Sequence, residues 1–216
     1  IIEGEISGVK NSTKAMMIFD TPGINNSLDS THTDVTINTI NLFSEGLILY
    51  LINAEQIGTY DDEQFLKFLV SKTQNDKNYR FIFVLNKMDA IDPDHENPYD
   101  LLENCRNYLM NCGIETPTII SVCALGGLLI KRVLNRENLS RKAIGDFMYF
   151  FELFEDRSYS MRNFCMTNCE NSPNDIFTVN GREFTRIQLE RALDNTGIPT
   201  LERLIDDCLL YTSDAA

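Results

Sequence analysis

The chain has 216 residues, which is enough for one domain with a sizeable core. Apolar residues make up 43% of it and charged residues 24%, a globular composition that excludes a disordered or collagen-like chain. The formal net charge is −13, so nucleic acid is not expected as a direct ligand of this segment. The longest apolar run, residues 46–54, falls well short of the roughly 20 residues that span a bilayer. We therefore expect a cytoplasmic protein.

Short continuous apolar runs predict strands that are buried on both faces of a sheet. Four such runs span residues 15–19, 47–52, 81–85 and 118–122. Between them, one predicted helix begins at the acidic residues 61–63, and another covers 101–112 with Gly113 as its stop. Strands that alternate with helices in this way predict βαβ units and a mostly parallel, Rossmann-like α/β sheet.

The alternation stops after residue 124, and residues 125–196 are predicted to be a mainly helical insertion. Within it, apolar spacing predicts helices over 125–134, 139–154 and about 184–193, whereas the polar stretch 157–180 is expected to be a loop. We divide the chain into a partial core (1–124), the insertion (125–196), a returning last helix (197–210) and a tail of non-native character (211–216).

Six cysteines without a recognisable metal pattern are expected to be reduced thiols. Cys165 and Cys169 form a close pair, but they have no second pair or nearby histidine, which disfavours zinc. The acidic residues at 92–96 lack the glycine and terminal glutamate of a calcium loop and are expected to be a solvated turn.

The first chemical motif is Asp20-Thr21-Pro22-Gly23, which follows the first apolar run. A carboxylate at a strand end can hold Mg²⁺ through water beside the β- and γ-phosphates of a nucleotide. A glycine three residues later lets a backbone N–H approach the γ-phosphate, a contact that exists only before hydrolysis. Taken alone, these residues would equally fit a Pro-Gly turn.

The second motif is Asn86-Lys87-Met88-Asp89, directly after the third run. Guanine presents a ring N–H and an exocyclic amine side by side, and one carboxylate such as Asp89 can accept from both. Adenine would leave that carboxylate unpaired, which can produce discrimination on the order of 10⁴-fold. We expect Asn86 to brace the loop and the Lys87 stem to lie along the ring. A solvated polar turn is the alternative.

The third motif is Cys123-Ala124 after the fourth run, where a backbone N–H near Ala124 would bond the guanine carbonyl oxygen. The three motifs in this order resemble the third, fourth and fifth guanine-nucleotide boxes of the GTPase superfamily. The resemblance implies a three-layer P-loop GTPase fold that binds GTP and GDP, with Mg²⁺ at Asp20 through water. Cys123 stands where the family more often has serine.

Three flanking phrases resemble dynamin-like GTPases, especially bacterial ones: residues 20–27, residues 49–54 with the acidic pair at 61–62, and residues 196–202. This likeness implies a nucleotide-dependent homodimer and peripheral membrane remodelling through parts that this sequence does not contain. A GTPase of ribosome or RNA maturation, and a septin-like scaffold that binds nucleotide without hydrolysis, stay open as alternatives.

The sequence contains no Gly-x-x-x-x-Gly-Lys-Ser/Thr phosphate loop. That loop and its lysine hold the phosphates in P-loop enzymes. We therefore expect an N-terminally truncated GTPase domain, with no confidently identified catalytic residue and no hydrolysis by this chain alone.

Overall fold

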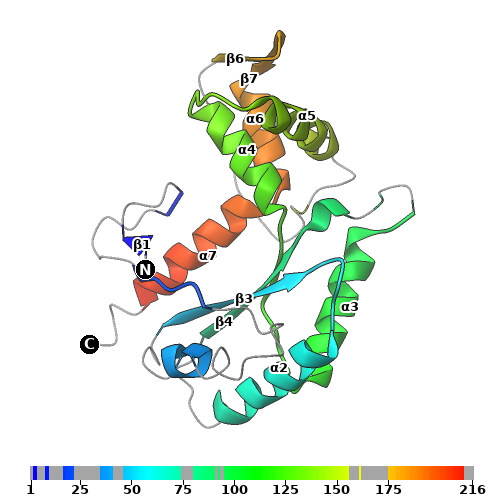
Figure 1. Ribbon diagram of the computed structural model, residues 1–216, viewed down its shortest axis with the longest axis vertical. Helices are drawn as coiled ribbons and strands as arrows, with labels where there is room; N and C mark the ends of the chain where they lie inside the picture. The colour runs from blue at the N-terminus through cyan, green and yellow to red at the C-terminus, as the bar shows by residue number, and fades with distance from the viewer. Residues whose placement is uncertain are drawn as a thin grey trace.

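A computed structural model of the chain describes residues 2–3, 8–9, 17–21, 35–40, 46–73, 80–90, 92, 95–155, 161 and 175–211. A three-stranded parallel sheet in the order β3-β4-β5 lies at its centre, with helices on both faces (Figure 1). The chain is therefore an α/β protein, as predicted, and its layout is compatible with a Rossmann-like arrangement.

The strands and their crossover helices alternate along the chain. The sheet consists of β3 (Leu47–Asn53), β4 (Arg80–Asn86) and β5 (Ile119–Ser121). Helix α2 (Tyr60–Thr73) connects β3 to β4, and α3 (Pro98–Asn111) connects β4 to β5. Both connections join parallel neighbours, so the carboxyl ends of the three strands meet at one edge of the sheet.

Local signals in the sequence fix where these two helices begin and end. The acidic residues 61–63 occupy the first turn of α2, where they face the positive end of the helix dipole. The side chain of Asn97 caps α3 by accepting from the Tyr99 N–H, and Pro98 fills the first helical position. Gly113 follows with φ of +98°, so the predicted stop of this helix is confirmed.

Alternate side chains of the strands enter two different apolar layers. On one face, Tyr50, Phe83 and Leu85 pack with α2 and α3. On the other face, Ile82 and Val84 pack with α7 (Ile198–Tyr211). Because both faces of β4 are covered, its sequence is a continuous apolar run rather than an alternating pattern.

One side of β3 differs from the rest of the sheet. β3 is an edge strand of the part of the sheet that the structure describes, and its register places Leu49 and Leu51 beside Ile82 and Val84. These two leucines are 37% and 66% exposed, whereas their neighbours on β4 are buried beneath α7. The apolar layer over β4 and β5 therefore extends past α7 without cover at β3.

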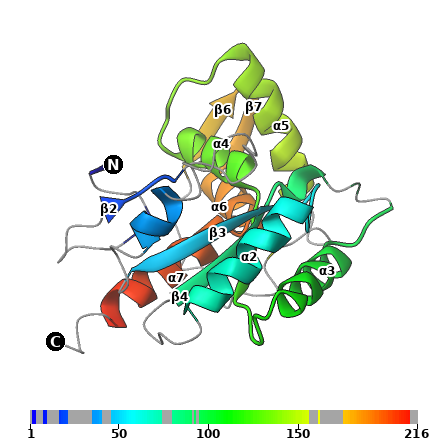
Figure 2. The ribbon, with the colours of Figure 1, turned by 60° about the horizontal axis from the view of Figure 1, so that its bottom comes forward.

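The insertion folds as a group of three helices and a hairpin beyond one end of the sheet (Figures 1 and 2). Its elements are α4 (Ala124–Leu134), α5 (Arg141–Glu155), β6 (Ile176–Val179), β7 (Arg182–Thr185) and α6 (Arg186–Asn195). The three helices match the predicted ones, but the prediction of a loop over 157–180 is wrong for its last residues, because β6 and its turn lie there.

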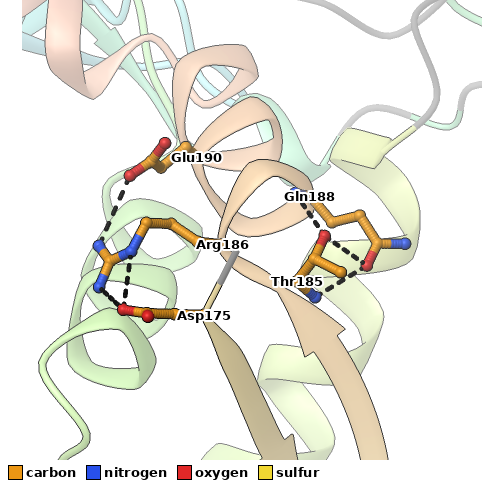
Figure 3. A network of polar contacts seen from close by, with 5 residues as sticks. All are labelled: Asp175, Thr185, Arg186, Gln188 and Glu190. Atoms are coloured by element: carbon orange, nitrogen blue, oxygen red, sulfur yellow. Dashed lines mark hydrogen bonds and ion pairs between the residues drawn. The ribbon is translucent and has the colours of Figure 1, made fainter. Parts of the chain in front are cut away.

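The hairpin has a local cause in the sequence. Asn180 and Gly181 form its two-residue turn with φ of +50° and +77°, the combination that Asn-Gly adopts most readily. Thr185 then caps α6 through a reciprocal capping box with Gln188 (Figure 3). In the same view, Arg186 donates to Asp175 just before β6, so the start of the hairpin is tied to the start of α6.

The first predicted strand is a correction. Within the described part of the run 15–19, Met17–Ile18 forms a strand, β2, which pairs antiparallel with β1 (Ile2–Glu3) in a separate two-stranded sheet. Ile18 is 40% exposed, so this strand is not buried on both faces. An apolar run predicts that a strand forms, but its pairing partner depends on contacts that are distant in sequence.

Gly197 joins α6 to α7 at a point where no side chain fits. Its φ is +77°, and a Cβ there would lie 2.1 Å from the carbonyl oxygen of Ser121 on β5. Gly181 has the same φ, but a Cβ there would meet no atom within 4 Å. A side chain at Gly197 would therefore cause both backbone strain and steric overlap, whereas one at Gly181 would cause backbone strain alone.

We predict that Gly197→Ala lowers the free energy of unfolding by about 3 kcal/mol or more, because strain and overlap act together. Gly181→Ala should cost only about 1 to 2 kcal/mol, because strain acts alone. Urea unfolding of both variants measures the difference. Equal losses would contradict the close packing of Gly197 on β5.

Candidate functional site

Two loops run side by side at the carboxyl ends of β4 and β5. The Val122 N–H donates to the Leu85 carbonyl at 2.8 Å, which extends the strand pairing beyond β5. The Met88 N–H donates to the Val122 carbonyl at 3.4 Å, which carries the contact into the loop after β4. Ligands of open parallel sheets bind at this edge, so the loops lie where a small-molecule site is expected.

Asn86 joins three segments at the end of β4. Its side-chain oxygen accepts from the Ala124 N–H at 3.1 Å, which ties β4 to the first residue of α4. Its backbone carbonyl accepts from the Ala54 N–H at 2.9 Å, which ties β4 to the segment after β3. The predicted bracing role of this asparagine thus has a geometric counterpart, with a partner in each neighbouring connection.

The turn that carries Asp89 is unusually sharp. Lys87 has φ of +65°, a left-handed conformation that side-chain-bearing residues adopt rarely and that is found often at functional sites. Met88 then enters the core with no exposed surface, and residues 88–90 form a single 3₁₀ turn. The Ala90 N–H closes this turn on the Lys87 carbonyl at 3.0 Å. Asp89 is left half-buried at its outer side.

Cys123 connects the two loops through its side chain. The thiol sulfur accepts from the Gly126 N–H at 3.3 Å, so Cys123 caps α4. The same thiol lies close to the Asp89 carboxylate. Burial, followed by the charge of that carboxylate, raises the pKa of the thiol, so it stays protonated at neutral pH. The sequence analysis did not predict that this side chain lies close to Asp89.

The junction between α6 and α7 supports the same loop. The Cys123 N–H donates to the Thr196 carbonyl at 2.9 Å, immediately before the close contact of Gly197 with β5. A Cβ at Gly127 on α4 would overlap Ile198, so α4 also packs tightly on the start of α7. Thr196 and Gly197, which belong to one of the phrases that resemble dynamin-like GTPases, therefore help to support the candidate site.

The predicted role of Ala124 meets a competing contact. Its N–H, expected to bond a guanine carbonyl oxygen, already donates to Asn86. An incoming carbonyl oxygen would have to share this N–H or displace the amide oxygen of Asn86. Lys87 is also engaged, because its ammonium group lies 3.0 Å from a carboxylate oxygen of Glu55. Both side chains of that pair are about half exposed, so the pair contributes little to stability.

The Asp20 motif lies apart from these loops in the fold. Asp20 is exposed and Thr21 is half-buried, directly after the separate strand β2. Pro22 and Gly23 lie outside the residues that the structure describes, as do Cys165 and Cys169. No contact between Asp20 and the loops after β4 and β5 is found within the described ranges.

Magnesium at Asp20 remains a prediction. The described part of the chain holds no group of three carboxylate, imidazole or thiol side chains that could form a metal site. Mg²⁺ often takes only one or two protein carboxylates together with phosphate oxygens.

Comparison with known proteins adds no relative: no family model, no curated protein and no solved structure matches this chain. Over the residues that the structure covers, none of the helices is long and apolar enough to cross a bilayer. Functional inference therefore rests on the arrangement of the loops after β4 and β5.

We predict that Cys123 and Cys105 resist alkylation in the folded protein at pH 8, whereas Cys208 reacts. Burial raises the pKa of Cys105 to about 12 and also raises that of Cys123, so both stay neutral thiols at this pH. Cys208 is only partly buried. Iodoacetamide treatment followed by peptide mass spectrometry measures each site, with the urea-unfolded chain as control. Early modification of Cys123 would contradict its complete burial.

Proposed function

We propose that this chain is the guanine-nucleotide-binding part of a dynamin-like GTPase. The observation that carries the proposal is the convergence of Asn86, Asp89, Cys123 and Ala124 at the carboxyl ends of β4 and β5. Each of the three motifs follows an apolar run in the sequence. The second and third motifs contact each other through Asn86 and Ala124. A plain solvated turn after β4 would not require a left-handed Lys87 or a buried thiol beside Asp89.

Base recognition would use the Asp89 carboxylate as a two-pronged acceptor. Its oxygens would accept from the ring N–H and the exocyclic amine of guanine. The Cys123 thiol lies close to the carboxylate and would limit its conformational freedom before the base binds. Adenine would offer the carboxylate no such pair of donors, and the loss of both contacts at this half-buried group would disfavour it.

Hydrolysis would require a phosphate-binding loop, which this sequence does not contain. The parent reaction is in-line attack of water on the γ-phosphate, with Mg²⁺ neutralising the developing charge when bound. The uncovered leucines of β3 lie on an edge strand of the described sheet, where a further strand can pair. A parallel strand there would end beside the segment that follows β3.

Dimerisation on nucleotide binding and remodelling of membranes follow from the family likeness alone. We retain them as part of the proposal for the parent protein, together with a cytoplasmic location and peripheral membrane contact. GTPases of ribosome maturation and nucleotide-binding scaffolds share the same base-recognition motifs, and no contact in the described chain favours either of them.

We predict that Asp89→Asn weakens binding of GDP at least tenfold, because it removes a charged acceptor of two hydrogen bonds. The variant should gain affinity for xanthosine diphosphate, because the amide donates to the carbonyl that xanthine carries in place of the amine. Equilibrium dialysis with both nucleotides measures this exchange. Asp92→Asn, a carboxylate three residues further along the chain, serves as the matched control. An unchanged preference in Asp89→Asn would contradict the proposal.

We also predict that the purified chain releases no phosphate from GTP above a buffer control. The reason is the lack of the lysine-bearing loop in its sequence. A malachite green assay with GTP and Mg²⁺ measures it. Phosphate release above the buffer control would contradict this prediction. Loss of that release in Asp20→Ala would then assign it to a phosphate site in this chain that is not a P-loop.

A further inference from the structure

We infer that helix α5 of the insertion is part of the base-recognition site, with Tyr149 as a positioning residue for Asp89. This inference rests on the proposed guanine site and deepens it. None of the sequence motifs pointed to α5, which lies about 60 residues beyond Asp89 in the chain.

Tyr149 contacts the turn that carries the base-reading carboxylate. Its hydroxyl donates to the backbone carbonyl of Asp89 at 3.4 Å. Tyr149 is 52% exposed, so its hydroxyl could be fully hydrated, yet it donates to this carbonyl. The Asp89 carboxylate lies close to the Cys123 thiol. Asp89 is thus held at its backbone by α5, and its carboxylate faces the start of α4.

The position of Tyr149 is fixed by its neighbour on α5. The rings of Tyr149 and Phe150 meet edge to face with centroids 5.3 Å apart. Phe150 is 5% exposed, and its ring packs on the backbone of Gly126 in the first turn of α4, where a Cβ would lie 3.3 Å away. The helix therefore contacts both loops of the site, the turn after β4 through Tyr149 and the start of α4 through Phe150.

The far end of α5 is anchored to the same support. The Asn195 side-chain amide donates to the Phe154 carbonyl at 2.6 Å, and Asn195 is almost completely buried. The next residue, Thr196, accepts from the Cys123 N–H. A path of contacts therefore runs from Asp89 through α5 and Asn195 to Cys123, whose thiol lies close to the Asp89 carboxylate. Displacement of α5 would release the turn that selects the base.

Tyr149→Phe tests this inference, because it keeps the ring and its packing on Phe150 but removes the hydroxyl. We expect threefold to tenfold weaker binding of GDP, about the effect of one neutral hydrogen bond. The preference for GDP over inosine diphosphate, which lacks the exocyclic amine, should also fall. The reason is that a looser turn weakens the hydrogen bond from this amine to the Asp89 carboxylate. The urea midpoint should stay at the wild-type value. Saturation-transfer NMR titrations with GDP, inosine diphosphate and ADP provide the affinities.

Tyr99→Phe on α3 is the matched control, since Tyr99 is similarly exposed at 42%. Wild-type selectivity in Tyr99→Phe together with reduced selectivity in Tyr149→Phe supports the inference. If the wild-type chain prefers GDP to ADP and loses this preference in Asp89→Asn, but Tyr149→Phe matches wild type, the inference alone is overturned. Equal losses for all three nucleotides with a lowered urea midpoint also overturn it, because the role is then structural. A wild-type chain that does not distinguish GDP from ADP overturns both the inference and the proposed function.

Discussion

The hydrogen bond from the Ala124 N–H to the side chain of Asn86 is the contact on which the candidate site depends. It joins the end of β4 to the start of α4, so the loops after two neighbouring strands behave as one unit. The Cys123 thiol, at the start of α4, lies close to the Asp89 carboxylate in the loop after β4. This polar contact at a sheet edge thus keeps the two loops of the candidate site together.

The core around β4, the junction between α6 and α7, and helix α5 all support this unit. Buried aliphatic side chains on both faces of β4 fix where the strand ends. Close packing of Gly197 against β5 brings the Thr196 carbonyl to the Cys123 N–H. The insertion contributes α5, which contacts the turn at Asp89. Core packing and the candidate site are therefore coupled, because both use the same junction between α6 and α7.

The parallel sheet and its helices could be predicted from the sequence because buried strands and capped helices leave strong local signals. The hairpin at 176–185 was missed because the polar residues around it outweighed the Asn180–Gly181 turn signal. The short run at 15–19 was assigned to the wrong sheet, since strand pairing is decided by distant contacts. The second and third motifs could be located from the sequence because each follows an apolar run, and the structure joins them through Asn86 and Ala124, whereas the Tyr149 contact is purely tertiary and leaves no local pattern.

Amide NMR spectra of the chain, titrated in parallel with GDP and ADP, test the proposed guanine site most directly. The account predicts that GDP shifts the backbone amide signals of Asp89 and Ala124, because the base binds between these residues, and that ADP at the same concentration shifts them far less. Equal shifts with both nucleotides, or shifts confined to other parts of the chain, would contradict it.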